Sequence, residues 1–95
     1  HLALSLNNLG LVLSESKQPK QAEAAFNEAL ALRKKLAVDF PGDPVHPAEQ
    51  ARVLGNLGGM WTDTERQSDA EKAFAEAVAI QKKLVAKYPR APKFR

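Results

Sequence analysis

The residues closest to acid–base chemistry in this sequence are Asp43 and His46, because a carboxylate beside an imidazole is a common start for a general base. A covalent mechanism would also need a serine or cysteine nucleophile within hydrogen-bond reach of the imidazole. The chain contains no cysteine, and no recognisable pattern places a serine near His46. We therefore predict that His46 is a solvent-exposed loop residue and that the chain is not an enzyme.

Residues for a metal or phosphate site are also sparse. The two histidines, His1 and His46, lie far apart, and a chain without cysteine offers no thiolate ligand. Three glycines, Gly55, Gly58 and Gly59, do not have the Gly-x-Gly-x-x-Gly spacing of a phosphate-binding loop, and no predicted strand precedes them. We expect neither a metal nor another cofactor. We interpret Gly58 as a helix-packing glycine and the other two as an open or flexible wall.

A basic run near the C-terminus is the clearest charge feature. Six cations and no acid follow Glu76, whereas residues 1–47 carry five cations and five acids. The run consists of Lys82, Lys83, Lys87, Arg90, Lys93 and Arg95, interleaved with Tyr88 and Phe94. Basic residues interleaved with aromatics occur at nucleic-acid surfaces, but cations near a helix C-terminus also complement the helix dipole. We favour the second explanation and do not expect nucleic-acid binding.

Length and composition limit the class of protein. The 95 residues are enough for one small domain, and 44% apolar with 26% charged residues is an ordinary globular composition. No apolar run approaches the roughly 20 residues that a membrane-spanning helix needs. We expect a single domain, 1–95, in the cytoplasm and without a membrane segment.

The sequence repeats itself after 48 residues. Residues 1–47 and 49–95 have 17 identities in 47 aligned positions without a gap. The matched pairs include Leu9 with Leu57, Gly10 with Gly58, Ala22 with Ala70, Phe26 with Phe74, and Leu36 with Leu84. Self-similarity at a fixed period indicates a repeat architecture. We therefore divide the chain into a first repeat, 1–47, and a second repeat, 48–95.

Each repeat is predicted to form two helices, because apolar residues recur at steps of three and four. The four stripes are Leu2, Leu6, Leu9 and Leu13; Ala22, Phe26, Ala29, Arg33 and Leu36; Val53, Leu54, Leu57, Met60 and Trp61; and Ala70, Phe74, Ala77, Leu84 and Tyr88. No stretch alternates apolar and polar residues long enough to indicate a strand. Five carboxylates are predicted to be solvated: Glu15, Glu23, Glu28, Glu71 and Glu76.

Helix ends are indicated by prolines and by one capping pattern. Pro19 suits a first helical turn, and Pro41-Gly42 ends the second helix. Residues 41–47 form the predicted loop, after which Pro47 opens the third helix. Ser68 followed by Glu71 is a capping-box pattern for the fourth helix.

Gly10 and Gly58 lie inside predicted helices, where glycine costs up to about 1 kcal/mol relative to alanine. The same cost at the same place in both repeats indicates that the partner helix crowds the backbone there. Small alanines let paired helices approach closely, and Phe26 and Phe74 are predicted to fill the space between neighbouring repeats.

The pattern resembles the tetratricopeptide repeat, whose helix pairs carry Leu-Gly in the first helix and Ala-x-x-x-Phe in the second. Here Leu9-Gly10 is followed by Ala22-x-x-x-Phe26, and both motifs recur 48 positions later. The resemblance implies an all-α, right-handed α-solenoid of two helix-turn-helix repeats with four helices. It also implies that the chain binds other proteins.

Two departures from the family pattern are visible. The period of 48 exceeds the usual length of about 34, and is similar to that of kinesin-light-chain-type repeats and of long repeat arrays in large bacterial multidomain proteins. Lys17 and Glu65 occupy the places where the turn between paired helices usually has glycine. We expect the chain to be a piece of a longer array.

The resemblance also implies a concave groove lined by the first helix of each pair. Carried over by position, the groove candidates are Asn7, Asn8, Leu11, Arg52, Asn56 and Gly59, next to Leu4, Glu15, Gly55 and Asp63. The amides of Asn8 and Asn56 are suited to bond a peptide backbone, or else to tie adjacent repeats together. Arg52 is suited to pair with a ligand carboxylate. The family's clamp for C-terminal carboxylates is not expected, because Asn7 and Leu11 stand where it needs lysine and asparagine.

The first helix is apolar on almost every side and is therefore expected to have neighbours on both. Its apolar residues are Leu2, Leu4, Leu6, Leu9, Leu11, Val12 and Leu13. Two functions follow. The first is a non-catalytic scaffold that binds a protein or peptide partner in the concave groove. The alternative is a structural module that forms homo-oligomers through exposed apolar repeat ends.

Overall fold

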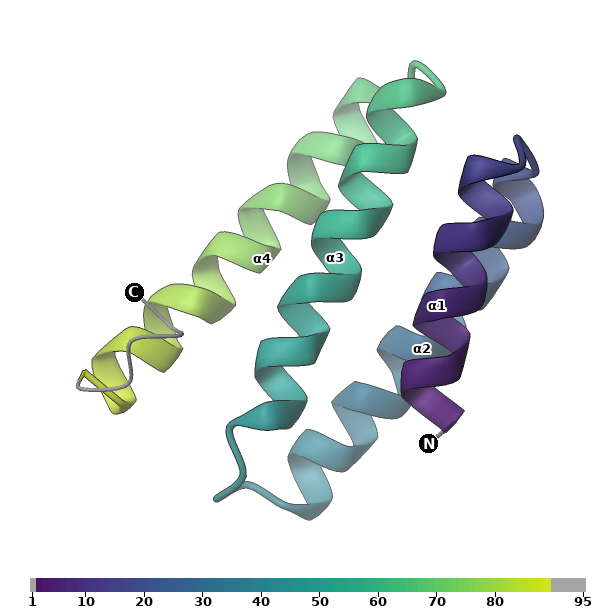
Figure 1. Cartoon of the computed structure of the whole chain (residues 1–95). Helices are drawn as coiled ribbons and strands as arrows, with labels where there is room; N and C mark the ends of the chain where they lie inside the picture. The colour runs from purple at the N-terminus through teal and green to yellow at the C-terminus, as the bar shows by residue number, and fades with distance from the viewer. Residues whose placement is uncertain (1, 90–95) are drawn as a thin grey trace.

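A computed structural model describes residues 2–89 of the chain. This part contains four helices, α1 (Leu2–Glu15), α2 (Pro19–Asp39), α3 (Val45–Asp63) and α4 (Gln67–Lys87), and it contains no strand. Helix α1 packs on α2 and α3 packs on α4, so that two helical hairpins stand side by side with α2 against α3 (Figure 1). The predicted all-α fold of two helix-turn-helix units is confirmed.

The core lies at the junction between the hairpins, where α2 meets α3. The residues buried in this junction are Ala22, Phe26 and Ala29 from α2, and Val53, Leu57 and Met60 from α3. These are the apolar residues that the three- and four-residue spacing assigns to one face of each helix. Leu6, Leu13, Leu30 and Trp61 pack around them. We call this set of six buried residues the inter-hairpin junction.

Each hairpin contains a close approach of a phenylalanine ring to a glycine backbone. A Cβ atom added at Gly10 would lie 2.6 Å from the Phe26 ring, and one at Gly58 would lie 2.6 Å from the Phe74 ring. Such distances are far inside van der Waals contact, so the ring occupies the space that a side chain would need. The predicted crowding of both glycines by the partner helix is confirmed.

The turn inside each hairpin contains a residue in the left-handed backbone region, Lys17 with φ 60° and Glu65 with φ 63°. The backbone N–H of Gln18 donates to the carbonyl oxygen of Leu13 at 2.9 Å. In the second hairpin the N–H of Arg66 donates to the carbonyl oxygen of Trp61 at 2.7 Å. These bonds form a Schellman turn, which usually has glycine at the left-handed position. A side chain there costs about 1–2 kcal/mol. Both turns nevertheless keep the Schellman geometry, although lysine and glutamate stand where the family usually has glycine.

Two predicted helix starts are wrong by two residues. Helix α3 begins at Val45 rather than Pro47, because Pro44 already has helical dihedrals and the Asp43 carboxylate accepts a hydrogen bond from the Val45 N–H at 3.0 Å. Pro47 then lies in the first turn, where its missing N–H is not needed. Helix α4 begins at Gln67 without any side-chain cap, so Ser68 is not a capping residue.

Phe74 also differs from its prediction. It packs on Gly58 of its own hairpin but remains 42% exposed, whereas Phe26 is fully buried between the two hairpins. The reason is that α3 covers α2, while no helix of the described chain covers α4 in the same way.

Candidate functional site

The candidate site is the face of α1 and α3 that points away from α2 and α4. We call it the open face and define it by Leu4, Asn8, Leu11 and Glu15 on α1, and by Arg52, Gly55, Asn56, Gly59 and Asp63 on α3. Asn8, Leu11 and Arg52 are exposed on it, while Asn56 and Gly59 are half-buried. Helix periodicity brings these positions to one side of each helix because, apart from the adjacent Gly55 and Asn56, they follow one another at steps of three and four.

Asn7 is the one groove candidate that the structure buries. Its side-chain oxygen accepts a hydrogen bond from the Asn56 amide nitrogen at 3.0 Å, so the two asparagines join α1 to α3. The structural role considered for Asn56 is therefore present, although its partner is Asn7 and not Asn8. A primary amide has two N–H groups and one oxygen. The bond to Asn7 uses one N–H, which leaves Asn56 with a donor and an acceptor at the edge of the open face.

Gly55 and Gly59 flank Asn56 and have a different environment from Gly10 and Gly58. A Cβ atom at either position would meet no atom within 4 Å, so packing does not require glycine there. Each glycine still costs helix α3 up to about 1 kcal/mol relative to alanine. Over about one helical turn of the open face, these two positions of α3 have no side chain to cover the backbone. Another chain can therefore approach the backbone closely there.

Arg52 is the cation of the open face. Its guanidinium lies 3.7 Å from the carboxylate of Glu49, and its side chain is 65% exposed. An exposed ion pair of this length contributes little to stability. Most of the guanidinium donors face solvent and can bind a carboxylate in the forked geometry that arginine favours.

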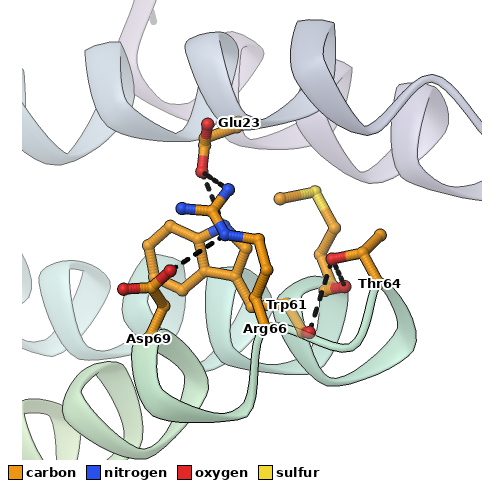
Figure 2. A network of polar contacts seen from close by, with 6 residues as sticks. Glu23, Trp61, Thr64, Arg66 and Asp69 are labelled. Carbon is orange, nitrogen blue, oxygen red and sulfur yellow. Dashed lines mark hydrogen bonds and ion pairs between the residues drawn. The ribbon is translucent and has the colours of Figure 1, made fainter.

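A polar network at the turn end of the hairpins was not predicted. Glu23 of α2 accepts hydrogen bonds from the Trp61 indole nitrogen and from the Arg66 guanidinium, both at 2.6 Å. Arg66 also binds Asp69 at 2.9 Å and lies over the Trp61 ring at 5.0 Å from its centre. Figure 2 shows Glu23 reaching from the first hairpin toward these residues of the second. Glu23 is therefore not a solvated carboxylate as predicted.

The charges in this network support one another. The hydrogen bond to Asp69, together with the hydrogen bond and charge of Glu23, raises the pKa of Arg66 above its ordinary value despite partial desolvation. The guanidinium thus stays charged, and the network joins the two hairpins beside the inter-hairpin junction. The signal in the sequence was the single tryptophan, but nothing local to it identifies Glu23, which lies 38 positions away.

The prediction of an exposed loop histidine at position 46 is wrong. His46 lies in the first turn of α3 with 8% exposure, and its Nδ1 atom is 3.2 Å from the Arg33 guanidinium, which is also buried. The Asp43 carboxylate is 3.8 Å from its other ring nitrogen, and the Phe40 ring packs nearby. Because arginine only donates, His46 accepts this hydrogen bond. The residue joins the end of α2 to the start of α3 across the connection between the hairpins.

Other predicted features fall partly outside the described residues. Lys82, Lys83 and Lys87 are exposed on α4, while Arg90, Phe94 and the other basic residues of the run, like His1, lie outside the described range. Within residues 2–89, no group of three or more potential metal ligands occurs. The helices of that range are also too short or too polar to cross a bilayer.

Comparisons with known proteins agree with the repeated hairpin. A family model described as tetratricopeptide repeat matches the chain twice, over residues 2–48 and 50–86. The two matches cover both hairpins of the structure. Neither a curated protein nor a solved structure gives a significant match to the chain.

Proposed function

Because this chain belongs to the tetratricopeptide repeat family, we propose that it is a non-catalytic scaffold that binds a peptide or protein segment on its open face. Tetratricopeptide repeats generally mediate protein–protein interaction. Family membership alone does not locate the binding surface, since function depends on the residues of a site. The proposal therefore depends on features of the open face itself.

The observation that carries the proposal is the pair of glycines for which packing gives no reason. Gly55 and Gly59 weaken α3 without relieving any contact. A bare helix surface allows a bound chain to come close to the α3 backbone. Asn56 lies between them and has a free donor and a free acceptor, the two groups that an extended peptide backbone needs from a partner.

The chemistry at the edges of the open face restricts the bound segment. Arg52 favours an acidic side chain, and the exposed Leu4 and Leu11 on α1 favour an apolar one. We propose that Asn7 acts indirectly, by holding the Asn56 amide in place through its buried oxygen. Asn8 extends the same face with one further amide group.

A peptide selected from a random display library against the full chain tests the proposal. We expect Arg52→Glu and Asn56→Ala each to weaken binding of that peptide by about tenfold, which corresponds to about 1.4 kcal/mol. Lys34→Glu on the exposed surface of α2 is the matched charge control and leaves the dissociation constant within twofold. Selected peptides that depend on Lys34 and not on Arg52 would assign binding to the other face.

Gly55→Ala and Gly59→Ala provide the sharper test. Each substitution raises the free energy of unfolding, because alanine favours the helix, yet each weakens peptide binding because the new methyl group occupies the approach to α3. Opposite signs for stability and binding would not arise from a merely structural role. Gly42→Ala in the loop between the hairpins, where a Cβ also meets no atom within 4 Å, is the control that leaves binding unchanged. Equal peptide affinity for all three variants contradicts the proposal.

A further inference from the structure

A cavity of about 430 Å³ lies between the two hairpins at their turn ends. We call it the turn-end cavity, and its volume is in the range of small-ligand pockets. Its lining consists of Ser14, Glu15, Lys17 and Pro19 from the first hairpin, and Met60, Asp63 and Thr64 from the second. Glu15 and Asp63 also belong to the open face, so the cavity adjoins the surface to which we assign the bound segment.

The two carboxylates of the turn-end cavity have no partner in the described part of the chain. Within residues 2–89, neither Glu15 nor Asp63 makes a side-chain hydrogen bond or an ion pair, and both are exposed. Lys17 lines the same cavity and pairs with neither of them. Two carboxylates against one ammonium group leave the cavity with an excess of negative charge.

Both carboxylates also occupy positions that are unfavourable for their helices. Glu15 is the last residue of α1 and Asp63 the last residue of α3, and neither helix has a basic residue in its last turn. The negative end of the helix dipole lies there, so a carboxylate at this place destabilises the helix. As with Gly55 and Gly59, helix stability gives no reason for these residues.

The inner wall of the turn-end cavity is apolar. Met60 belongs to the inter-hairpin junction and is 4% exposed, and Pro19 lines the cavity beside it. An apolar wall next to exposed carboxylates suits a lysine or arginine side chain, whose methylene stem contacts apolar surface while its head stays charged. An acidic side chain would meet like charges. An apolar one would take water from the two carboxylates without replacing its hydrogen bonds.

We propose that the turn-end cavity binds a basic side chain of the segment that lies on the open face, an inference that rests on the proposed function. The stem of this side chain contacts Met60 and Pro19, and its charged head binds Glu15 and Asp63. Arginine fits best, because its planar head has five donors and can bond two carboxylates at once.

The cavity also fixes the spacing of charges in the bound segment. Asp63 follows Arg52 by 11 residues of α3, which is about 16 Å along the helix. An extended chain advances about 3.3 Å per residue. We therefore expect the acidic residue that binds Arg52 and the basic residue in the cavity to lie about four to six positions apart in the segment.

The single methionine of the chain, Met60, reports directly on the cavity. We expect N-acetyl-arginine methylamide to shift the methyl resonance of ¹³C-labelled Met60 in a saturable way. The uncharged isostere N-acetyl-citrulline methylamide, at equal ionic strength, leaves the resonance in place. The double variant Glu15→Gln/Asp63→Asn loses the shift. Glu28→Gln, at an exposed carboxylate of α2 outside the cavity, keeps it.

A loss of fold would not imitate this result. Neutralising a carboxylate at a helix C-terminus removes a repulsion with the dipole, so the double variant is expected to keep its helicity and to unfold at a slightly higher urea concentration. Higher stability together with lost arginine binding would not arise from a merely structural role of the two carboxylates.

Three outcomes overturn the proposal: a Met60 resonance that ignores blocked arginine, an equal response to blocked citrulline, and an equal response in the double variant. None of them involves a bound segment, so each leaves the proposed function intact. Conversely, display-selected peptides that depend on neither Arg52 nor Asn56 would contradict the proposed function, and with it the assignment of the basic side chain to a segment on the open face.

Peptide display tests the spacing. Peptides selected against the wild type should carry lysine or arginine about four to six positions from an acidic residue. Glu15→Gln and Asp63→Asn should each weaken such a peptide about two- to fivefold, as for exposed ion pairs. In the double variant, replacing the basic residue of the peptide by glutamine should cause no further loss. Losses that simply add would show that this residue does not meet the two carboxylates, and would overturn the proposal.

Discussion

Helices α2 and α4 are the same element in two surroundings. Both have 21 residues, end with the same capping hydrogen bond of 2.8 Å, and carry Ala-x-x-x-Phe-x-x-Ala at the same place. Helix α2 packs between α1 and α3 and buries its phenylalanine completely, while α4 packs mainly on α3 and leaves its phenylalanine partly exposed. The comparison separates features that the local sequence determines from features that the neighbouring hairpin determines.

The largest difference is expected for the two phenylalanines. Phe26→Ala removes a fully buried ring and lowers the free energy of unfolding by about 3–5 kcal/mol. Phe74→Ala removes a ring that already contacts water, and the loss is about half as large. Urea unfolding followed by circular dichroism at low protein concentration measures both. Equal losses would mean that α4 is covered as fully as α2.

The two packing glycines come next. Gly10→Ala and Gly58→Ala introduce the same clash of 2.6 Å, but the ring that must move is confined by α3 in one case and half-exposed in the other. We expect Gly10→Ala to cost about 2–3 kcal/mol and Gly58→Ala about 1 kcal/mol. The same unfolding assay checks this order, and a larger cost at Gly58 would contradict the account of Phe74 as the freer ring.

The two glutamates give a smaller effect. Glu23→Ala leaves the Trp61 indole without its acceptor and costs on the order of 1 kcal/mol. Glu71→Ala, at the corresponding position of α4, changes the free energy of unfolding by much less. Fluorescence of the single tryptophan, followed alongside circular dichroism, reports whether the contact between hairpins opens before the helices melt. A stability loss of equal size at Glu71 would contradict the comparison.

The smallest change in stability is expected for the two turn residues, and it should be equal in the two hairpins. Lys17→Gly and Glu65→Gly relieve left-handed strain and each stabilise the chain by about 0.5 kcal/mol, because part of the relief is offset by the greater freedom of glycine in the unfolded chain. Since the turn geometry is local, thermal unfolding of the two variants should give matching shifts. A clear difference between them would show that the neighbouring hairpin also acts on the turns.

The sequence predicted the features that depend on nearby residues. The stripe through Ala22 and Phe26, the glycine at position 10 and the proline at position 19 each identify a helix, its packed face or its first turn. The repeat at 48 residues then places the second hairpin beside the first. These signals are sufficient for the fold, because the contacts within each hairpin and the apolar core between α2 and α3 involve residues that the spacing reveals.

The parts that sequence reasoning missed depend on contacts between hairpins. The burial of His46 requires Arg33 from the preceding helix, and the pairing of Glu23 requires Trp61 from the following one. The exposure of Phe74 is the converse case, since its residue type and spacing match those of a buried residue. The open face could be located from the resemblance, but its two unexplained glycines could be recognised only after the packing of the other glycines was known.

The buried hydrogen bond between Arg33 and His46 is one of the contacts that fix the tilt between the two hairpins. The bond joins the last turns of α2 to the first turn of α3, and such bonds tolerate little angular change. The α2–α3 contact is thus held at both of its ends, by this bond beside the loop and by the bond between Glu23 and Trp61 beside the turns. Extra residues inserted at the exposed Gly42 would therefore lengthen the connection and leave the tilt between the two hairpins unchanged.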